Sequence, residues 1–168
     1  MKIKRAIYPG TFDPITNGHM DIIKRASVIF DEIVVAVAKS DEKGPMFPHK
    51  QRITMAKAAC ESFGNVKVEG FSNLLVEFCH QMDAKIIIRG LRSFSDFEYE
   101  LQMGYANSSL DPEIETIYLM TDLKNSFISS SIVRSILKHN SSCAHLVPPK
   151  VNGIILKGTS KKFRKVIR

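Results

Sequence analysis

Two hydrophobic patterns alternate along the chain. Short runs of apolar, mainly β-branched residues are typical of strands buried in a parallel sheet, and apolar residues at every third or fourth position are typical of helices. The predicted strands comprise residues 3–7, 32–38, 66–68, 85–89 and 115–120. The predicted helices comprise residues 20–30, 49–63, 74–82, 94–107, 129–137 and 149–156. A helix thus follows nearly every predicted strand.

This alternation is typical of βαβ units with right-handed crossovers. We predict an α/β fold, with a Rossmann-like, doubly wound, parallel five-stranded sheet and helices on both faces. No linker or internal repeat interrupts the pattern, so we expect one domain over residues 1–156 and a disordered basic tail over 157–168. In such folds ligands bind beyond the carboxyl ends of the strands, which makes the loops after the strands the candidate site.

The stretch from Tyr8 to His19 follows the first predicted strand and contains two prolines and two glycines. These residues predict a compact loop and then a helix capped by Asn17 or Gly18, with His19 in its first turn. Unpaired N–H groups and the helix dipole make such a helix start an anion site. The spacing matches neither a Walker loop nor a dinucleotide fingerprint. We therefore expect a phosphorylated ligand of another class.

The loops after the later strands also carry residues suited to phosphate binding. Lys43 follows the second strand, and Arg89 and Arg92 flank a glycine after the fourth. A serine cluster at 129–131 begins a helix after the fifth strand. No pair of carboxylates and no nucleophile–histidine–acid trio stands at catalytic spacing. This combination favours phosphoryl or nucleotidyl transfer, in which positioning and charge neutralisation supply most of the catalysis.

Composition narrows the range of partners. The formal net charge is +7, but residues 123–168 hold ten Lys and Arg without any Asp or Glu, and six of the ten fall in 157–168. Such a tail can bind nucleic acid, yet it is more often a solvated terminus, so nucleic acid is not the expected partner. The three cysteines are far apart, and the other histidines form no metal-ligand pattern. With no membrane span or signal region expected, these features predict a cytoplasmic protein without a protein-bound metal.

Several phrases resemble known families. Thr16-Asn17-Gly18-His19 and the late Ser-Ser-x-x-Arg phrase ending at Arg134 resemble the nucleotidyltransferase superfamily. Tyr8 to Pro14, Ile88 to Arg92, Asp96 to Glu100 and Phe127 to Ser131 are similar, in order and spacing, to the bacterial phosphopantetheine adenylyltransferases. The resemblance extends from Arg5 to about Pro148.

The resemblance implies transfer of AMP from ATP to 4′-phosphopantetheine by direct in-line attack, giving dephospho-coenzyme A and pyrophosphate, with Mg²⁺ as cofactor. His19 would act as a neutral donor to the α-phosphate. The implied catalytic residues are His19, Thr11, Lys43 and Arg92. The residues implied to bind the acceptor are Thr11, Lys43, Leu75 and Arg89. Those implied to bind ATP are Thr11, Phe12, His19, Gly90, Leu91, Arg92, Glu100, Asn125, Ser126, Phe127, Ile128, Ser129, Ser130 and Ser131.

Two positions depart from the family pattern, since Asn125 stands where many members have an aromatic residue and Leu75 where methionine is common. The resemblance also implies a homohexamer and feedback by coenzyme A. Two alternatives stay open. One is a related enzyme that uses another phosphorylated acceptor, such as nicotinamide mononucleotide or glycerol phosphate. The other is a nucleotide-sensing or nucleic-acid-binding protein that uses the basic tail.

Overall fold

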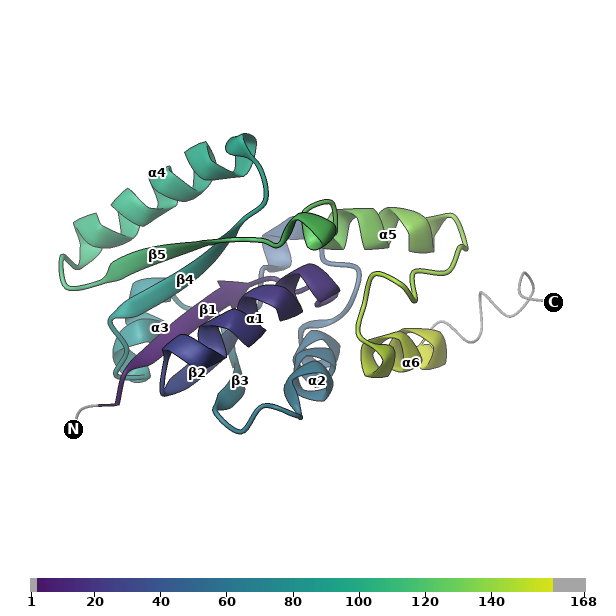
Figure 1. Cartoon of the computed structure of the whole chain (residues 1–168), viewed down its shortest axis with the longest axis horizontal. Coiled ribbons are helices and arrows are strands. Elements are labelled where there is room, and N and C mark those ends of the chain that lie inside the picture. Colours follow the sequence, from purple (N-terminus) through teal and green to yellow (C-terminus); the bar gives the residue numbers. More distant parts are fainter. Residues whose placement is uncertain (1–2, 159–168) are drawn as a thin grey trace.

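A parallel sheet of five strands forms the centre of the molecule (Figure 1). The computed structural model describes residues 3–158, except the side chains of Lys43, Phe94 and Ser95. The strand order is β3-β2-β1-β4-β5, which is the doubly wound arrangement that the sequence predicts. The strands are β1 (Arg5–Gly10), β2 (Glu32–Ala38), β3 (Val66–Phe71), β4 (Ile86–Leu91) and β5 (Glu115–Met120).

Helices cover both faces of this sheet, as predicted. They are α1 (Asn17–Ile29), α2 (His49–Cys60), α3 (Leu75–Gln81), α4 (Phe94–Leu110), α5 (Ser130–Lys138) and α6 (Pro149–Gly158), with short 3₁₀ turns η1 (Asp41–Lys43) and η2 (Leu123–Asn125). Successive strand residues point to opposite faces. Ile33 and Val35 therefore pack in the cluster formed with α1, α2, α5 and α6. Val34 packs in the opposite cluster with α3, beside which α4 lies against β4 and β5.

The two central strands separate toward their carboxyl ends. The ladder between β1 and β4 pairs only Ala6 with Ile86 and Ile7 with Ile87, although both strands continue further. The carbonyl oxygen of Pro9 instead accepts a hydrogen bond from Arg89 Nη1 at 2.9 Å. In a strand, the N–H and the C=O of one residue point to the same side. The N–H that Pro9 lacks would therefore point toward β4, where the ladder between β1 and β4 has already ended. A proline is tolerated in a central strand here for that reason.

Several predicted boundaries were wrong, and for the strands the reason is that pairing extends past the hydrophobic pattern. β1 continues through Gly10, so the loop begins at Thr11 rather than Tyr8. β3 continues to Phe71, paired with Ala38, and β4 includes Leu91, paired with Met120. Helix α2 ends at Cys60, α4 reaches Leu110 and α6 reaches Gly158. The start of the predicted tail is therefore helical, and residues 159–168 lie outside the described part.

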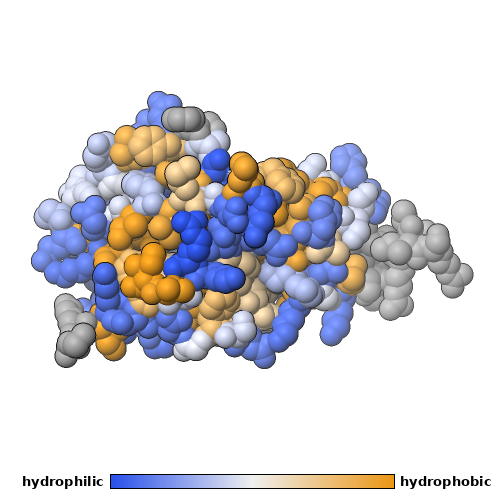
Figure 2. All heavy atoms as spheres, viewed as in Figure 1, coloured by the Kyte–Doolittle hydropathy of each residue, from blue (hydrophilic) through white to orange (hydrophobic). Residues whose placement is uncertain are grey.

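Hydrophobic and hydrophilic residues are interspersed over the face seen in Figure 2. The largest exposed fractions among the large hydrophobic residues are those of Val28, Leu123 and Met120, at 86%, 86% and 75%. Within residues 3–158, no helix has both the length and the apolar character needed to span a membrane.

Candidate active site

Two adjoining cavities lie at the carboxyl ends of β1, β2 and β4, where the sequence places the candidate site. The larger has a volume of about 260 Å³ and lies between the loop after β1, the start of α1 and the start of α5. The smaller, of about 200 Å³, lies between β1, α3 and α4. Both are lined by Pro9, Gly10, Thr11, Arg89 and Glu100, so these five residues stand at the junction.

The structure brings most of the predicted site residues to these two cavities. The larger is lined by Thr11, Phe12, His19, Arg89, Gly90, Arg92, Glu100, Ile128, Ser129, Ser130 and Ser131. Leu75 lines the smaller cavity, near Phe71 and Met103. Among the described linings, neither cavity includes Leu91, Asn125, Ser126 or Phe127, and their assignment to ATP stays a prediction. Lys43 belongs to η1, but its side chain lies outside the described part.

His19 is held at the start of α1 by a reciprocal capping box. The predicted cap at Asn17 or Gly18 was wrong, because Thr16 is the N-cap and His19 occupies the third helical position. The Thr16 hydroxyl accepts from the His19 N–H at 3.4 Å, and the Thr16 N–H donates to His19 Nδ1 at 3.0 Å. A nitrogen that accepts an N–H carries no proton, so the proton of the neutral ring is on Nε2. His19 therefore has a donor left for a ligand.

The environment of His19 keeps its imidazole neutral. Burial lowers its pKa to about 3, and the positive charges of Arg92 and Arg89 lower it in the same direction. The Phe12 ring contacts the imidazole edge-on, with a centroid distance of 5.0 Å. A neutral ring can donate one hydrogen bond to a phosphate oxygen without transferring a proton to it.

The glycines of this site permit close approaches. A Cβ on Gly10 would lie 2.9 Å from the Phe12 ring, and a Cβ on Gly18 would lie 3.1 Å from the carbonyl oxygen of Ile128. Gly18 thus allows the start of α1 to approach the loop before α5. Phe12 itself adopts a left-handed backbone conformation with φ of 47°. That conformation costs about 1–2 kcal/mol, and it is held by the burial of the Phe12 ring against Tyr8 and His19.

The two arginines after β4 are held by carboxylates. Glu100 accepts from Arg89 Nε at 2.5 Å and from Nη2 at 2.6 Å, a bidentate pair. Arg92 pairs with Asp96 at 3.0 Å and is more exposed. Because an arginine has five N–H donors, Arg89 keeps donors beyond its bonds to Glu100 and Pro9. Glu100 therefore orients Arg89 at the junction, which the sequence did not predict.

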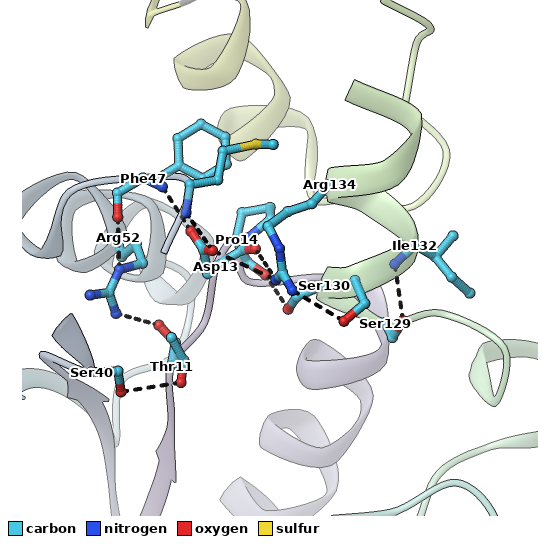
Figure 3. A network of polar contacts seen from close by, with 12 residues as sticks. Thr11, Asp13, Pro14, Ser40, Phe47, Arg52, Ser129, Ser130, Ile132 and Arg134 are labelled. Carbon is cyan, nitrogen blue, oxygen red and sulfur yellow. Dashed lines mark hydrogen bonds and ion pairs between the residues drawn. The ribbon is translucent and has the colours of Figure 1, made fainter. Parts of the chain in front are cut away.

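The serine cluster lines the larger cavity, and Figure 3 shows Ser129 and Ser130 at the start of α5. Ser129 is the N-cap, and its hydroxyl accepts from the N–H of Ile132 at 3.2 Å. The hydroxyl of Ser130 donates to the carbonyl oxygen of Pro14 at 2.9 Å, and that of Ser131 accepts from Arg134 at 3.1 Å. Helix geometry leaves the N–H groups of Ser130 and Ser131 without an intrahelical acceptor. These two N–H groups and the helix dipole suit an anion.

The sequence did not predict some residues at and around the smaller cavity. Ser40 lies 3.3 Å from the Thr11 hydroxyl, and Asn107 and Thr116 line the smaller cavity. On α4, Met103 and Asn107 are four residues apart and face that cavity together. This helical spacing could have indicated that Met103 and Asn107 share a face. The approach of Thr116 to the cavity depends on where the sheet places its strand.

The described residues contain no group of three or more His, Cys, Asp or Glu placed to hold a metal ion. Mg²⁺ commonly binds through one or two carboxylates together with substrate phosphates and water. In the described lining of the larger cavity the carboxylate is Glu100, and the other polar side chains are basic or bear hydroxyl groups.

Comparison with known proteins identifies the class. The crystal structure of a protein assigned as a nicotinate-nucleotide adenylyltransferase from Vibrio parahaemolyticus matches 92% of this chain and 99% of its own, with a TM-score of 0.71 and 18% identity. At that identity the likeness shows the fold alone. The sequence model of the cytidylyltransferase-like family matches residues 7–136. The chain is thus a nucleotidyltransferase-type α/β protein.

Closer relatives share more of the sequence. The phosphopantetheine adenylyltransferase of Wolinella succinogenes is 60% identical over 157 residues, covering 94% of this chain and 98% of that relative. The protein of the same name from Helicobacter hepaticus is 62% identical over 143 residues, covering 85% and 87%. The chain belongs to the phosphopantetheine adenylyltransferase family.

Proposed function

We propose that this protein transfers AMP from ATP to 4′-phosphopantetheine, forming dephospho-coenzyme A and releasing pyrophosphate, a step of coenzyme A synthesis. The observation that carries the proposal is the pair of cavities that meet at Thr11 and Arg89. The larger one, with His19 and the start of α5, suits the triphosphate of ATP. The smaller one has apolar walls at Phe71, Leu75 and Met103, which suit an uncharged pantetheine arm.

In the proposed reaction, an oxygen of the acceptor phosphate attacks the α-phosphorus of ATP in line, and the bond to pyrophosphate breaks. The Nε2–H of His19 donates to a non-bridging α-phosphate oxygen, where negative charge develops. Thr11 and Arg89 orient the acceptor phosphate at the junction, and Lys43 and Arg92 neutralise charge. The N–H groups at the start of α5 bind the departing pyrophosphate.

Mg²⁺ belongs to this proposal as a cofactor that enters on ATP. Bound to the phosphate oxygens, it would neutralise charge on the leaving pyrophosphate. Glu100 is the carboxylate that lines both cavities, and it is engaged by Arg89. Omitting Mg²⁺ should therefore lower turnover without changing the melting temperature of the protein in the absence of ATP.

The test of the proposed function is pyrophosphate release from ATP and Mg²⁺ with a panel of acceptors. The panel contains 4′-phosphopantetheine, nicotinamide mononucleotide and glycerol 3-phosphate. Release with phosphopantetheine alone would support the proposal. Release with another acceptor would retain the His19 chemistry and assign a different substrate, and no release with any acceptor would favour a nucleotide-sensing protein.

The role of His19 gives a sharper expectation. Replacing His19 with Ala removes a donor to the charged transition state, so kcat should fall by about 100- to 1,000-fold. The affinity for a non-hydrolysable ATP analogue should change much less, because the arginines and α5 are retained. Steady-state kinetics and calorimetric titration measure the two quantities. A variant with near-normal kcat would remove His19 from the mechanism.

Assembly, regulation and location complete the proposal. We expect a homohexamer, feedback by coenzyme A and a cytoplasmic location, as in the family that the chain resembles. The exposure of Val28, Met120 and Leu123 is consistent with surfaces that become covered on assembly. Sedimentation velocity would measure the assembly, and a monomer at micromolar concentration would contradict it.

A further inference from the structure

Arg52 is a fully buried arginine that does not line either cavity. Its exposed fraction is 0%, and it lies in the first turn of α2. Among the described residues no carboxylate lies within ion-pair distance of it. A buried charge without a partner of opposite sign is costly, so its hydrogen-bond acceptors have to account for its retention.

Those acceptors are four backbone carbonyl oxygens, three from the segment that runs from the end of β2 to α2 and one from the loop after β1. Arg52 Nε donates to Phe47 at 3.0 Å, and Nη1 donates to Thr11 at 2.6 Å and to Ala38 at 2.7 Å. Nη2 donates to Lys39 at 2.6 Å. Burial lowers the pKa of this guanidinium, while the charges of Asp13 and Asp41 act in the opposite direction.

The four acceptors define what Arg52 holds in place. Ala38 and Lys39 lie at the start of the segment between β2 and α2, and Phe47 lies at its end, so one side chain fixes both ends of the segment that contains Lys43. Thr11 belongs to the other loop, the one after β1 (Figure 3), and it lines both cavities. The fork of five donors in fixed directions can reach these acceptors together, which the single ammonium of lysine cannot do.

Asp13 holds the carboxyl-terminal end of the same segment. Its buried carboxylate accepts from the N–H groups of Met46 at 2.8 Å and Phe47 at 2.9 Å. Asp13 thus binds the N–H of Phe47, and Arg52 binds the carbonyl oxygen of the same residue. Arg52 therefore anchors both ends of the segment that carries Lys43, and Asp13 anchors its second end. Through Arg52 and Asp13 the segment is tied to the loop after β1.

We propose that Arg52 is a positioning residue, which sets the backbone of Thr11 and of residues 38–47 so that Thr11 and Lys43 meet the reacting phosphates. This inference rests on the proposed function, because it presumes that these two residues act on phosphates. It predicts an effect of Arg52 on turnover that exceeds its effect on ATP binding, although Arg52 touches neither substrate.

The test compares Arg52→Lys with Met55→Ala. Met55 is a buried core residue on the same helix, and its loss should lower the melting temperature without moving either loop. Arg52→Lys should lower kcat by about 10- to 100-fold, the scale expected for a misplacement of about 1 Å. Its affinity for an ATP analogue should stay within about threefold, since His19 and α5 are retained. Met55→Ala, assayed well below its melting temperature, should keep kcat within about threefold of the wild-type value.

Amide hydrogen exchange supplies a readout that does not depend on turnover. In Arg52→Lys the N–H groups of Met46 and Phe47 should exchange at least about tenfold faster, whereas in Met55→Ala their protection should follow global stability. If Arg52→Lys does not fold, Arg52→Met removes the donors together with the buried charge, and the same measurements apply.

The outcomes separate the two proposals. A wild-type protein that fails to turn over phosphopantetheine would reject the proposed function, while hydrogen exchange would still judge whether Arg52 orders the segment. An Arg52→Lys protein with kcat within threefold of wild type and unchanged exchange at residues 46 and 47 would overturn the positioning role.

Discussion

At the scale of single residues, the hydrogen bond between the Thr16 N–H and His19 Nδ1 determines what the histidine can do. It assigns the tautomer, and burial with two nearby arginines keeps the ring uncharged. The family motif predicts a histidine at this helix start, but the partner that orients it is the N-cap backbone. The reactive atom, Nε2, follows from that contact.

The lowered pKa of His19 predicts a dependence of stability on pH. In the folded state the pKa is about 3, against 6.5 for an ordinary histidine. Between these values the unfolded chain binds a proton that the folded protein does not, so the free energy of unfolding falls as the pH is lowered below about 6.5. The slope contributed by His19 approaches about 1.4 kcal/mol per pH unit.

Urea unfolding of the wild-type protein and of His19→Asn at several pH values between 4.5 and 7.5 measures this contribution. The variant should lose less stability on acidification, and the offset between the two curves should become constant above pH 7. Parallel curves over the whole range would show that His19 does not have a lowered pKa in the folded state.

Gly10 is a second residue whose effect can be stated in advance. A methyl group in Gly10→Ala would lie 2.9 Å from the Phe12 ring, which is wedged between Tyr8 and His19. Moving this ring should cost about 1–3 kcal/mol of stability, as overpacking commonly does, and should lower kcat by displacing the imidazole. Chemical denaturation and steady-state kinetics test both effects.

Gly64→Ala is the matched control, because a Cβ at that position meets no atom within 4 Å. It should change stability by less than about 1 kcal/mol and leave kcat unaltered. If Gly10→Ala behaved like Gly64→Ala, the packing of Phe12 on His19 would have no part in orienting the imidazole.

At the scale of elements, α5 is docked onto the loop after β1 by Arg134. Its Nη1 donates to the carbonyl oxygen of Asp13 at 2.8 Å and lies 3.6 Å from the Asp13 carboxylate, and its Nη2 donates to Ser131. Figure 3 shows this side chain reaching from α5 to Asp13. The arginine of the Ser-Ser-x-x-Arg phrase is therefore turned toward the protein.

Arg134→Met should cost about 1–3 kcal/mol of stability, because it removes donors from acceptors that stay buried. It should also raise the KM for ATP, since the first turn of α5 lines the larger cavity. Lys138→Met, at the exposed end of the same helix, should leave both quantities near their wild-type values. An Arg134→Met protein with normal KM would show that α5 is positioned by its core residues alone.

At the scale of the whole molecule, the basic tail predicted over 157–168 can be tested by truncation. Because α6 continues to Gly158, the proper end point for a truncated protein is Gly158 rather than Leu156. Removal of residues 159–168 takes away five positive charges. Pyrophosphate release should be unchanged within about twofold, since the cavities lie at the strand ends.

Any nucleic-acid binding by the full-length protein should weaken steeply with salt and disappear in the truncated one, because phosphate contacts by the tail release counterions. Filter binding or fluorescence anisotropy at two salt concentrations measures this. Loss of pyrophosphate release together with the tail would contradict the assignment of catalysis to residues 1–158.

The amino-acid sequence alone predicted the five strands, the six helices and their doubly wound sheet, because hydrophobic periodicity reports which side of each element is buried. It also predicted most residues of the larger cavity, because they lie in the loops after strands, although Glu100, on a helix, was predicted only through the family resemblance. It placed the end of β3 at Val68 instead of Phe71, since the ladder to β2 is a contact between distant segments.

Tertiary structure decided how the separate loops meet. The sequence contains no signal that Arg52 would be buried under four carbonyl groups, that Glu100 would orient Arg89, or that Thr16 would assign the tautomer of His19. Each of these depends on where a side chain from one element arrives beside the backbone or the charge of another. Hydrophobic periodicity and local motifs determine which elements form, whereas hydrogen-bond geometry between elements determines which donors are left to face a ligand.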